Sequence, residues 1–106
     1  MAKEIITKPV DVTTTETTIF SVPAGKRLKV YIIRYKETAG TANTIEIKQK
    51  YGDTYTTKDK YPLTANEVYD LATSPDRPIF EVTGGTDLVG VASTGTVAVL
   101  IVGLLE

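Results

Sequence analysis

Turn signals recur about every 8 to 12 residues along the chain, and this spacing limits the fold more than any other feature. Between the turns lie short segments rich in Thr, Val, Ile and Tyr, whose branched or aromatic side chains suit a pleated sheet. No window of a dozen residues places its apolar side chains at helical spacing. A chain with this rhythm is expected to form a sandwich or barrel of strands.

The turns divide the chain into candidate strands. These cover residues 5–12, 17–22, 27–37, 44–51, 54–58, 67–71 (a short strand or one helical turn), 79–83, 88–92 and 96–105. The strongest turn is 23–26, because Pro presets φ and Gly accepts a positive φ. Residues 59–65, which contain Tyr61 and Pro62, are expected to be a loop. We predict an all-β fold, an antiparallel β-sandwich or small jelly roll of about eight strands.

Residues 27–37 are the clearest strand. Alternation puts apolar side chains on both faces, namely Leu28, Val30 and Ile32 on one and Tyr31, Ile33 and Tyr35 on the other. Apolar residues on both faces are typical of a central strand that is covered on both sides.

Length and composition limit the classes of function. The 106 residues suffice for one domain, residues 1–106, and the net charge of −1 argues against binding to nucleic acid or to an anionic membrane. The chain has no Cys and no His, so we expect no disulfide, no cofactor, no metal site and no enzymatic activity. No signal peptide is visible, and residues 97–105 are about half the length of a membrane helix, so we expect a protein made in the cytoplasm.

Carboxylates are the remaining candidates for chemistry. Glu46 with Glu67, or Asp53 with Asp59, could meet across a sheet as an acid–nucleophile pair. Acidic residues at alternating positions are more often the solvated face of a strand. No loop has the spacing of a calcium-binding loop.

Two groups of residues are candidate interface positions. The first is a set of tyrosines in the middle of the chain, Tyr51, Tyr55, Tyr61 and Tyr69. They fit cross-strand packing, a protein interface or a carbohydrate platform. The second group belongs to the apolar segment 97–105 and consists of Val97, Val99, Ile101, Leu104 and Leu105. That segment is expected to be a central strand, to pack against a neighbouring subunit, or both.

The N-terminal residues 1–12 have two interpretations. They form the first edge strand, which Pro9 favours, or residues 2–12 form an arm that adds to a sheet of a partner.

Residues 17–26 have the sequence TTIFSVPAGK and precede the strand 27–37. This turn resembles one found between the second and third strands of small β-sandwich proteins of tailed phages and related virions. The resemblance covers roughly residues 17–47 and implies a capsid decoration (cement) protein, a head fibre or a tail module. It assigns no functional residues.

These observations predict a non-enzymatic structural virion protein, made in the host cytoplasm, that stabilises a capsid. Its expected partners are copies of itself, with a trimer favoured, and a major capsid protein. The alternative is a carbohydrate- or receptor-binding β-sandwich module of the tail-fibre or adhesin type.

Overall fold

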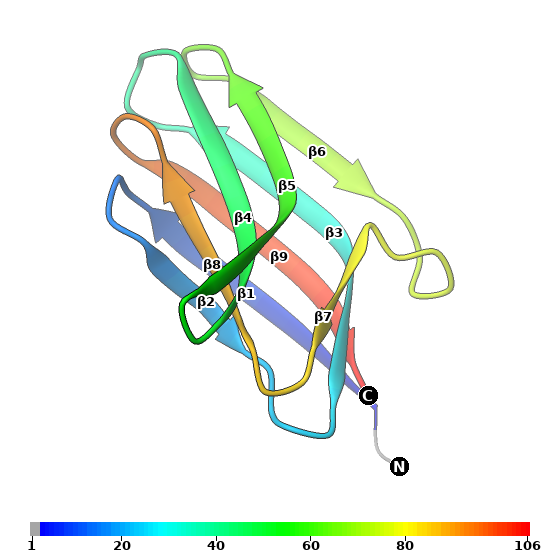
Figure 1. Ribbon diagram of the computed structural model, residues 1–106. Helices are drawn as coiled ribbons and strands as arrows, with labels where there is room; N and C mark the ends of the chain where they lie inside the picture. Colours follow the sequence, from blue (N-terminus) through cyan, green and yellow to red (C-terminus); the bar gives the residue numbers. More distant parts are fainter. Residues whose placement is uncertain (1–2) are drawn as a thin grey trace.

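The computed structural model describes residues 3–106, and all of the regular structure in this range is β-strand (Figure 1). The strands are β1 (Glu4–Val12), β2 (Thr17–Ser21), β3 (Arg27–Glu37), β4 (Asn43–Tyr51), β5 (Thr54–Leu63), β6 (Val68–Ala72), β7 (Phe80–Thr83), β8 (Asp87–Ala92) and β9 (Val97–Leu105). Two antiparallel sheets pack face to face, which confirms the predicted β-sandwich. No helix in residues 3–106 is long and apolar enough to cross a membrane.

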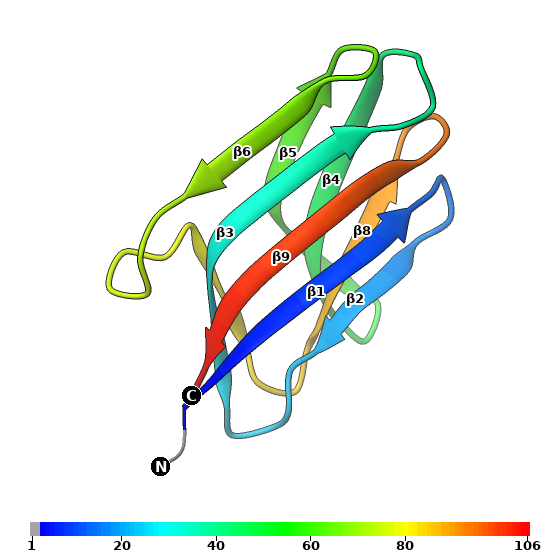
Figure 2. The same cartoon turned by 180° about the vertical axis from the view of Figure 1, so that it is seen from behind.

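The strand order is that of a jelly roll. Sheet A has the order β1-β9-β3-β6, with β7 also paired to β3, and sheet B has the order β2-β8-β4-β5. The first strand pairs with the last, the second with the last but one, and β4 with its neighbour β5. This nested pairing defines the jelly roll, with β6 and β7 sharing the place of one strand. Figure 2 shows sheet A from its outer side, with β9 between β1 and β3.

The core lies between the sheets and is built from alternate residues of nearly every strand. Its largest fully buried apolar side chains are Leu28, Ile33, Tyr35, Ile45, Ile47, Leu88 and Ile101. Val, Ile and Leu dominate because their branched side chains interdigitate between two pleated surfaces. Residues 4–12 form an edge strand of sheet A, paired with β9 along their whole length, while residues 1–2 of the arm considered above lie outside the described residues.

A β-bulge in β3 changes which side chains face the core. Val30 pairs with Gly103 and Ile32 with Val102, so Tyr31 is an extra residue on β3. An extra residue reverses the alternation beyond it. Residues before the bulge point inward at even numbers and residues after it at odd numbers. The prediction that β3 is a central strand is confirmed, but the prediction that it is covered on both sides, at least in its second half, was wrong.

Strand β5 continues through the segment predicted to be a loop. Asp59 pairs with Ile47 and Thr57 with Lys48, so a second bulge at Lys58 carries the strand onward to Leu63. Pro62 is tolerated because β5 is an edge strand of sheet B, where one side of the backbone needs no partner. The loop prediction for residues 59–63 was wrong, and the strand alternative for residues 67–71 is correct, with β6 shifted by one residue.

The turn that carries the family resemblance packs against a second turn. The Val22 N–H donates to the Thr86 carbonyl oxygen and the Gly85 N–H to the Val22 carbonyl oxygen, each at 2.9 Å. A Cβ atom at Gly84 would lie 2.7 Å from the Pro23 carbonyl oxygen and closer still to that of Lys26. Glycine at position 84 therefore lets the two turns approach.

We predict that Gly84→Ala destabilises the fold by about 3 kcal/mol, because the obstructing atoms belong to the backbone and cannot rotate away. The matched control is Gly40→Ala, where φ is +78° but no atom lies within 4 Å of the added Cβ. Its cost is about 1 kcal/mol of left-handed strain. Urea unfolding of both variants measures the difference, and equal losses would contradict the close packing of the turns.

Candidate functional site

The four candidate tyrosines lie in two separate places. Tyr61 on β5 and Tyr69 on β6 are half-buried against the core, with ring centroids 4.0 Å apart. Tyr69 in turn stacks on the buried Tyr35 at 6.0 Å. The Tyr61 hydroxyl donates to Glu67 at 3.0 Å. These three rings fill the side of the sandwich between β5 and β6, so Tyr61 and Tyr69 pack internally.

Tyr51 and Tyr55 flank the β4–β5 hairpin turn and are 68% and 43% exposed. Lys48 Nζ lies 4.5 Å from the centroid of the Tyr55 ring, and Lys50 Nζ is bound to Glu16 at 3.1 Å. Hydrogen bonds from Tyr55 and then Lys50 hold the pKa of Glu16 below its ordinary value, and Glu16 and Tyr55 raise the pKa of Lys50. Tyr55 is thus engaged by charged neighbours, and Tyr51 is the more exposed ring.

The candidate residues of β9 lie mostly inside the molecule. Val97, Val99, Ile101 and Leu105 face the core and are at most 4% exposed. Only Leu104 is on the other side of the strand, where it is half-buried. In the folded monomer the first four therefore contribute to the core and offer no contact surface.

The outer face of sheet A, meaning the outward side chains of β1, β9, β3 and β6, is apolar along its centre. On β9 it presents Ala98, Leu100, Val102 and Leu104, all half-buried. Cross-strand register sets the rows: Ala98 lies between Asp11 and Lys36, and Leu100 lies between Pro9 and Arg34. Partly exposed aliphatic side chains in a continuous line are typical of protein contact surfaces.

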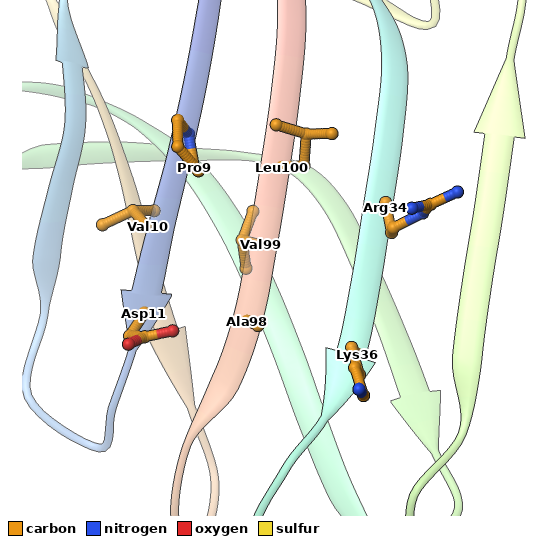
Figure 3. A pocket seen from close by; sticks show the side chains of 8 residues that line it. All are labelled: Pro9, Val10, Asp11, Arg34, Lys36, Ala98, Val99 and Leu100. Atoms are coloured by element: carbon orange, nitrogen blue, oxygen red, sulfur yellow. The ribbon is translucent and has the colours of Figure 1, made fainter.

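A shallow groove of about 400 Å³ runs over this face (Figure 3). Its floor includes Ala98 and Leu100, with Asp11 on the β1 side and Arg34 and Lys36 on the β3 side. Arg34 Nε is 2.6 Å from Asp70 Oδ1 on β6. Within residues 3–106, Asp11 and Lys36 have no ion-pair partner. The groove is thus apolar at its centre and carries opposite charges on its two sides.

Sequence reasoning missed most of this face. Both alternating sets of side chains in segment 97–105 are apolar, so the pattern did not identify the outward set. One usable signal was Gly103, which has the same alternation as Val97, Val99 and Ile101. A glycine at this position leaves room for Leu28 and so marks that set of residues as the one facing the core. The two basic residues Arg34 and Lys36 were another usable signal, because charged residues at alternating positions mark a solvated face.

Glu37 is a buried carboxylate at one end of the sandwich, 1% exposed. It accepts hydrogen bonds from the backbone N–H groups of Ala39 (2.9 Å), Gly40 (2.7 Å) and Asn66 (3.2 Å). Thr41 N–H and Asn43 Nδ2 also donate to it. Desolvation opposes ionisation, but these donors together hold the pKa of Glu37 below its ordinary value. Glu37 thereby ties the β3–β4 loop to the β5–β6 turn.

We predict that Glu37→Gln lowers the thermal midpoint by roughly 5 °C or more, because an amide nitrogen would then oppose backbone N–H donors. Hydrogen exchange at Ala39, Gly40 and Asn66 should become faster. Glu46→Gln is the control, since Glu46 accepts only a surface bond from the Thr57 hydroxyl. Unchanged exchange at the three amides would contradict the role of Glu37.

Glu106 is the centre of a cluster of cations. Its carboxylate is 2.7 Å from Lys29 Nζ, 3.2 Å from Arg27 Nη2 and 3.5 Å from Lys3 Nζ. The bonds from Lys29 and then Arg27 lower the pKa of Glu106 from its ordinary value of 4.5 to about 2. The cluster joins β3 to the end of β9 and is a structural tie.

Because the pKa of Glu106 is lowered on folding, ionised Glu106 stabilises the fold above pH 4.5, and the contribution is lost as the pH falls toward 2. We predict that Glu106→Gln flattens the decline of the thermal midpoint across this window. Glu81→Gln serves as the control, since the Glu81 side chain is 45% exposed and, among the described residues, forms an ion pair with Arg27 only. Parallel midpoint–pH curves for Glu106→Gln and the parent protein would refute the assignment.

Three of the four carboxylates considered as catalytic pairs have separate partners; Asp53, the fourth, lies in the β4–β5 turn. Glu46 bonds the Thr57 hydroxyl at 2.6 Å, whereas Glu67 accepts from Thr64 and Tyr61 near the β5–β6 turn. Asp59 accepts a 2.5 Å bond from the hydroxyl of Tyr35, whose pKa is raised, chiefly by burial and then by this bond. Across residues 3–106 no three acidic side chains gather in a way that could hold a metal ion.

Comparison of the chain with protein-family models finds no match, and comparison with curated proteins finds none either.

Proposed function

We propose that this chain is a non-enzymatic structural virion protein that decorates and stabilises a capsid. The observation that carries the proposal is the outer face of sheet A, a partly exposed aliphatic surface on a two-sheet sandwich. Such a surface suits association with other proteins and requires no chemistry. The TTIFSVPAGK turn at residues 17–26 adds the resemblance to small virion β-sandwich proteins.

The mechanism is the burial of apolar area against capsid subunits and other copies of the chain. Each Å² of apolar surface removed from water contributes roughly 25 cal/mol, from which the cost of association is subtracted. The rigidity of the sandwich keeps that cost low, because little chain has to be ordered on binding. Jelly rolls of this kind occur in viral capsid proteins and in lectins, so the fold itself fits both the proposal and its alternative.

The exposed Tyr51 favours the alternative, a carbohydrate- or receptor-binding module. Its ring is 68% exposed at the tip of the β4–β5 hairpin, where an aromatic face can stack on a sugar ring. A glycan array distinguishes this function from capsid decoration, because a decoration protein has no need of a glycan.

The proposal predicts specific, saturable binding to the capsid of the virus whose genome encodes the chain. Purified capsids stripped of the protein are mixed with increasing amounts of it, sedimented and assayed for bound copies. We expect binding to reach a plateau and the capsids to withstand higher temperatures or lower salt when decorated. Binding that does not saturate, or equals the binding to an unrelated capsid, would overturn the proposal.

A further inference from the structure

The apolar line on the outer face of sheet A extends the full length of β9. Ala98, Leu100, Val102 and Leu104 form it, and the neighbouring strands widen it. Leu104 pairs with Ile5 of β1, which is 65% exposed, and Val102 pairs with Ile32 of β3. On β6 the same face includes Val68, which pairs with Lys36 and is 50% exposed.

The charges on this face are distributed unequally about β9. The β3 side carries Lys29, Arg34 and Lys36, of which the first two are paired within the chain to Glu106 and Asp70. The β1 side carries Asp11 in the same row as Lys36, with Ala98 between them (Figure 3). Asp11 and Lys36 lie two strand spacings apart, on either side of β9, which is roughly 10 Å, so they do not pair with each other.

We propose that a second copy of this chain covers the outer face of sheet A, related to the first by a two-fold axis parallel to β9. Such an axis places the β1 side of one copy opposite the β3 side of the other. Residues that are paired across the strands, and so lie at the same level along β9, remain at the same level in both copies. Asp11 of each copy then faces Lys36 of the other, and the apolar line of β9 packs on its own equivalent. This inference rests on the self-association in the proposed function and gives it two-fold order in place of the trimer favoured by the sequence. Capsid subunits would then contact surfaces of the dimer outside this face.

The charges select this axis over the other two-fold arrangement. An axis that crosses the strands at right angles would set β3 against β3. The basic residues Lys29, Arg34 and Lys36 of the two copies would then face one another. Like charges across an interface oppose association. The axis parallel to β9 is therefore the arrangement that the charge pattern supports.

The size of the face fits a reversible dimer. With the axis along β9, the strands that face one another are β1, β9 and β3, while β6 extends beyond the β1 edge of the other copy. Three strands spaced about 4.8 Å apart and about 30 Å long cover roughly 430 Å² on each copy, or about 860 Å² in total. This area is below that of stable specific interfaces, which begin at about 1,200 Å², and within the range of weak complexes that form and dissociate readily. The two sheets A would pack about 10 Å apart at a small angle, as sheets do inside sandwiches.

Sedimentation velocity over a range of protein concentrations tests the pairing. We expect a monomer–dimer equilibrium for the parent protein and a dissociation constant raised roughly tenfold by Asp11→Lys or by Lys36→Asp alone. The double variant should recover the parent affinity, because the exchanged charges again face each other. Asp53→Lys makes the same charge change as Asp11→Lys in the β4–β5 turn and should leave the dimer intact.

A single cysteine locates the face directly, since the chain contains none. Ala98→Cys lies beside the proposed axis and should be joined to its equivalent by a short bismaleimide. Val91→Cys is the matched control, because Val91 is equally half-buried but faces outward on sheet B, where it pairs with Glu46. Cross-linking through position 91 and not position 98 would overturn the inference.

The inference fails independently of the proposed function. A parent protein that is monomeric or trimeric at every concentration overturns the two-fold dimer, whether or not it binds capsids. Loss of capsid binding by Asp11→Lys in a protein that is monomeric in solution would mean that a capsid subunit, and no second copy, covers this face. A dimer that never binds capsids would overturn the proposed function alone.

Discussion

The β-bulge at Tyr31 is the constraint on which the rest of sheet A depends. It lies between the part of β3 that pairs with β7 and the part that pairs with β6. At this point the Thr73 N–H donates to the Tyr31 carbonyl oxygen at 2.7 Å, and the Ile79 N–H donates to the Val30 carbonyl oxygen at 2.8 Å. The chain therefore leaves the sheet on one side of the bulge and returns on the other. The edge strand of sheet A opposite β1 is thus split into β6 and β7 at the position of the bulge in β3.

The same bulge decides which side chains of the second half of β3, residues 32–37, face the core and which face outward. Beyond it, Ile33 and Tyr35 face the core while Arg34 and Lys36 face outward. It also turns Glu37 inward, where the carboxylate has no solvent and must be satisfied by the loops around it. One extra residue thus produces both the basic side of the outer face and the buried acceptor that orders the loops.

The strands were largely predictable from the sequence, and their faces were not. Turns such as 23–26 and 84–85 are marked by Pro and Gly, whose backbone preferences act locally. A bulge has no such mark, so the alternation of β3 was assigned as if the strand were regular. Proximity in sequence likewise grouped Tyr51 with Tyr61, although the bulge at Lys58 and the length of β5 carry them to different parts of the sandwich. Which face of β9 is outward depends on pairing with distant strands and cannot be read from an all-apolar segment.

The in-register pairing of β1 with β9 has a mechanical consequence. Glu4 lies opposite Leu105, so the outer ends of both strands meet at one corner of the molecule. A force applied between these two residues would unzip the pair, breaking the hydrogen bonds between the strands one after another. A force applied across the sheet would instead load many of these bonds at once. The fold would therefore resist loads spread over its faces better than loads on the two chain ends.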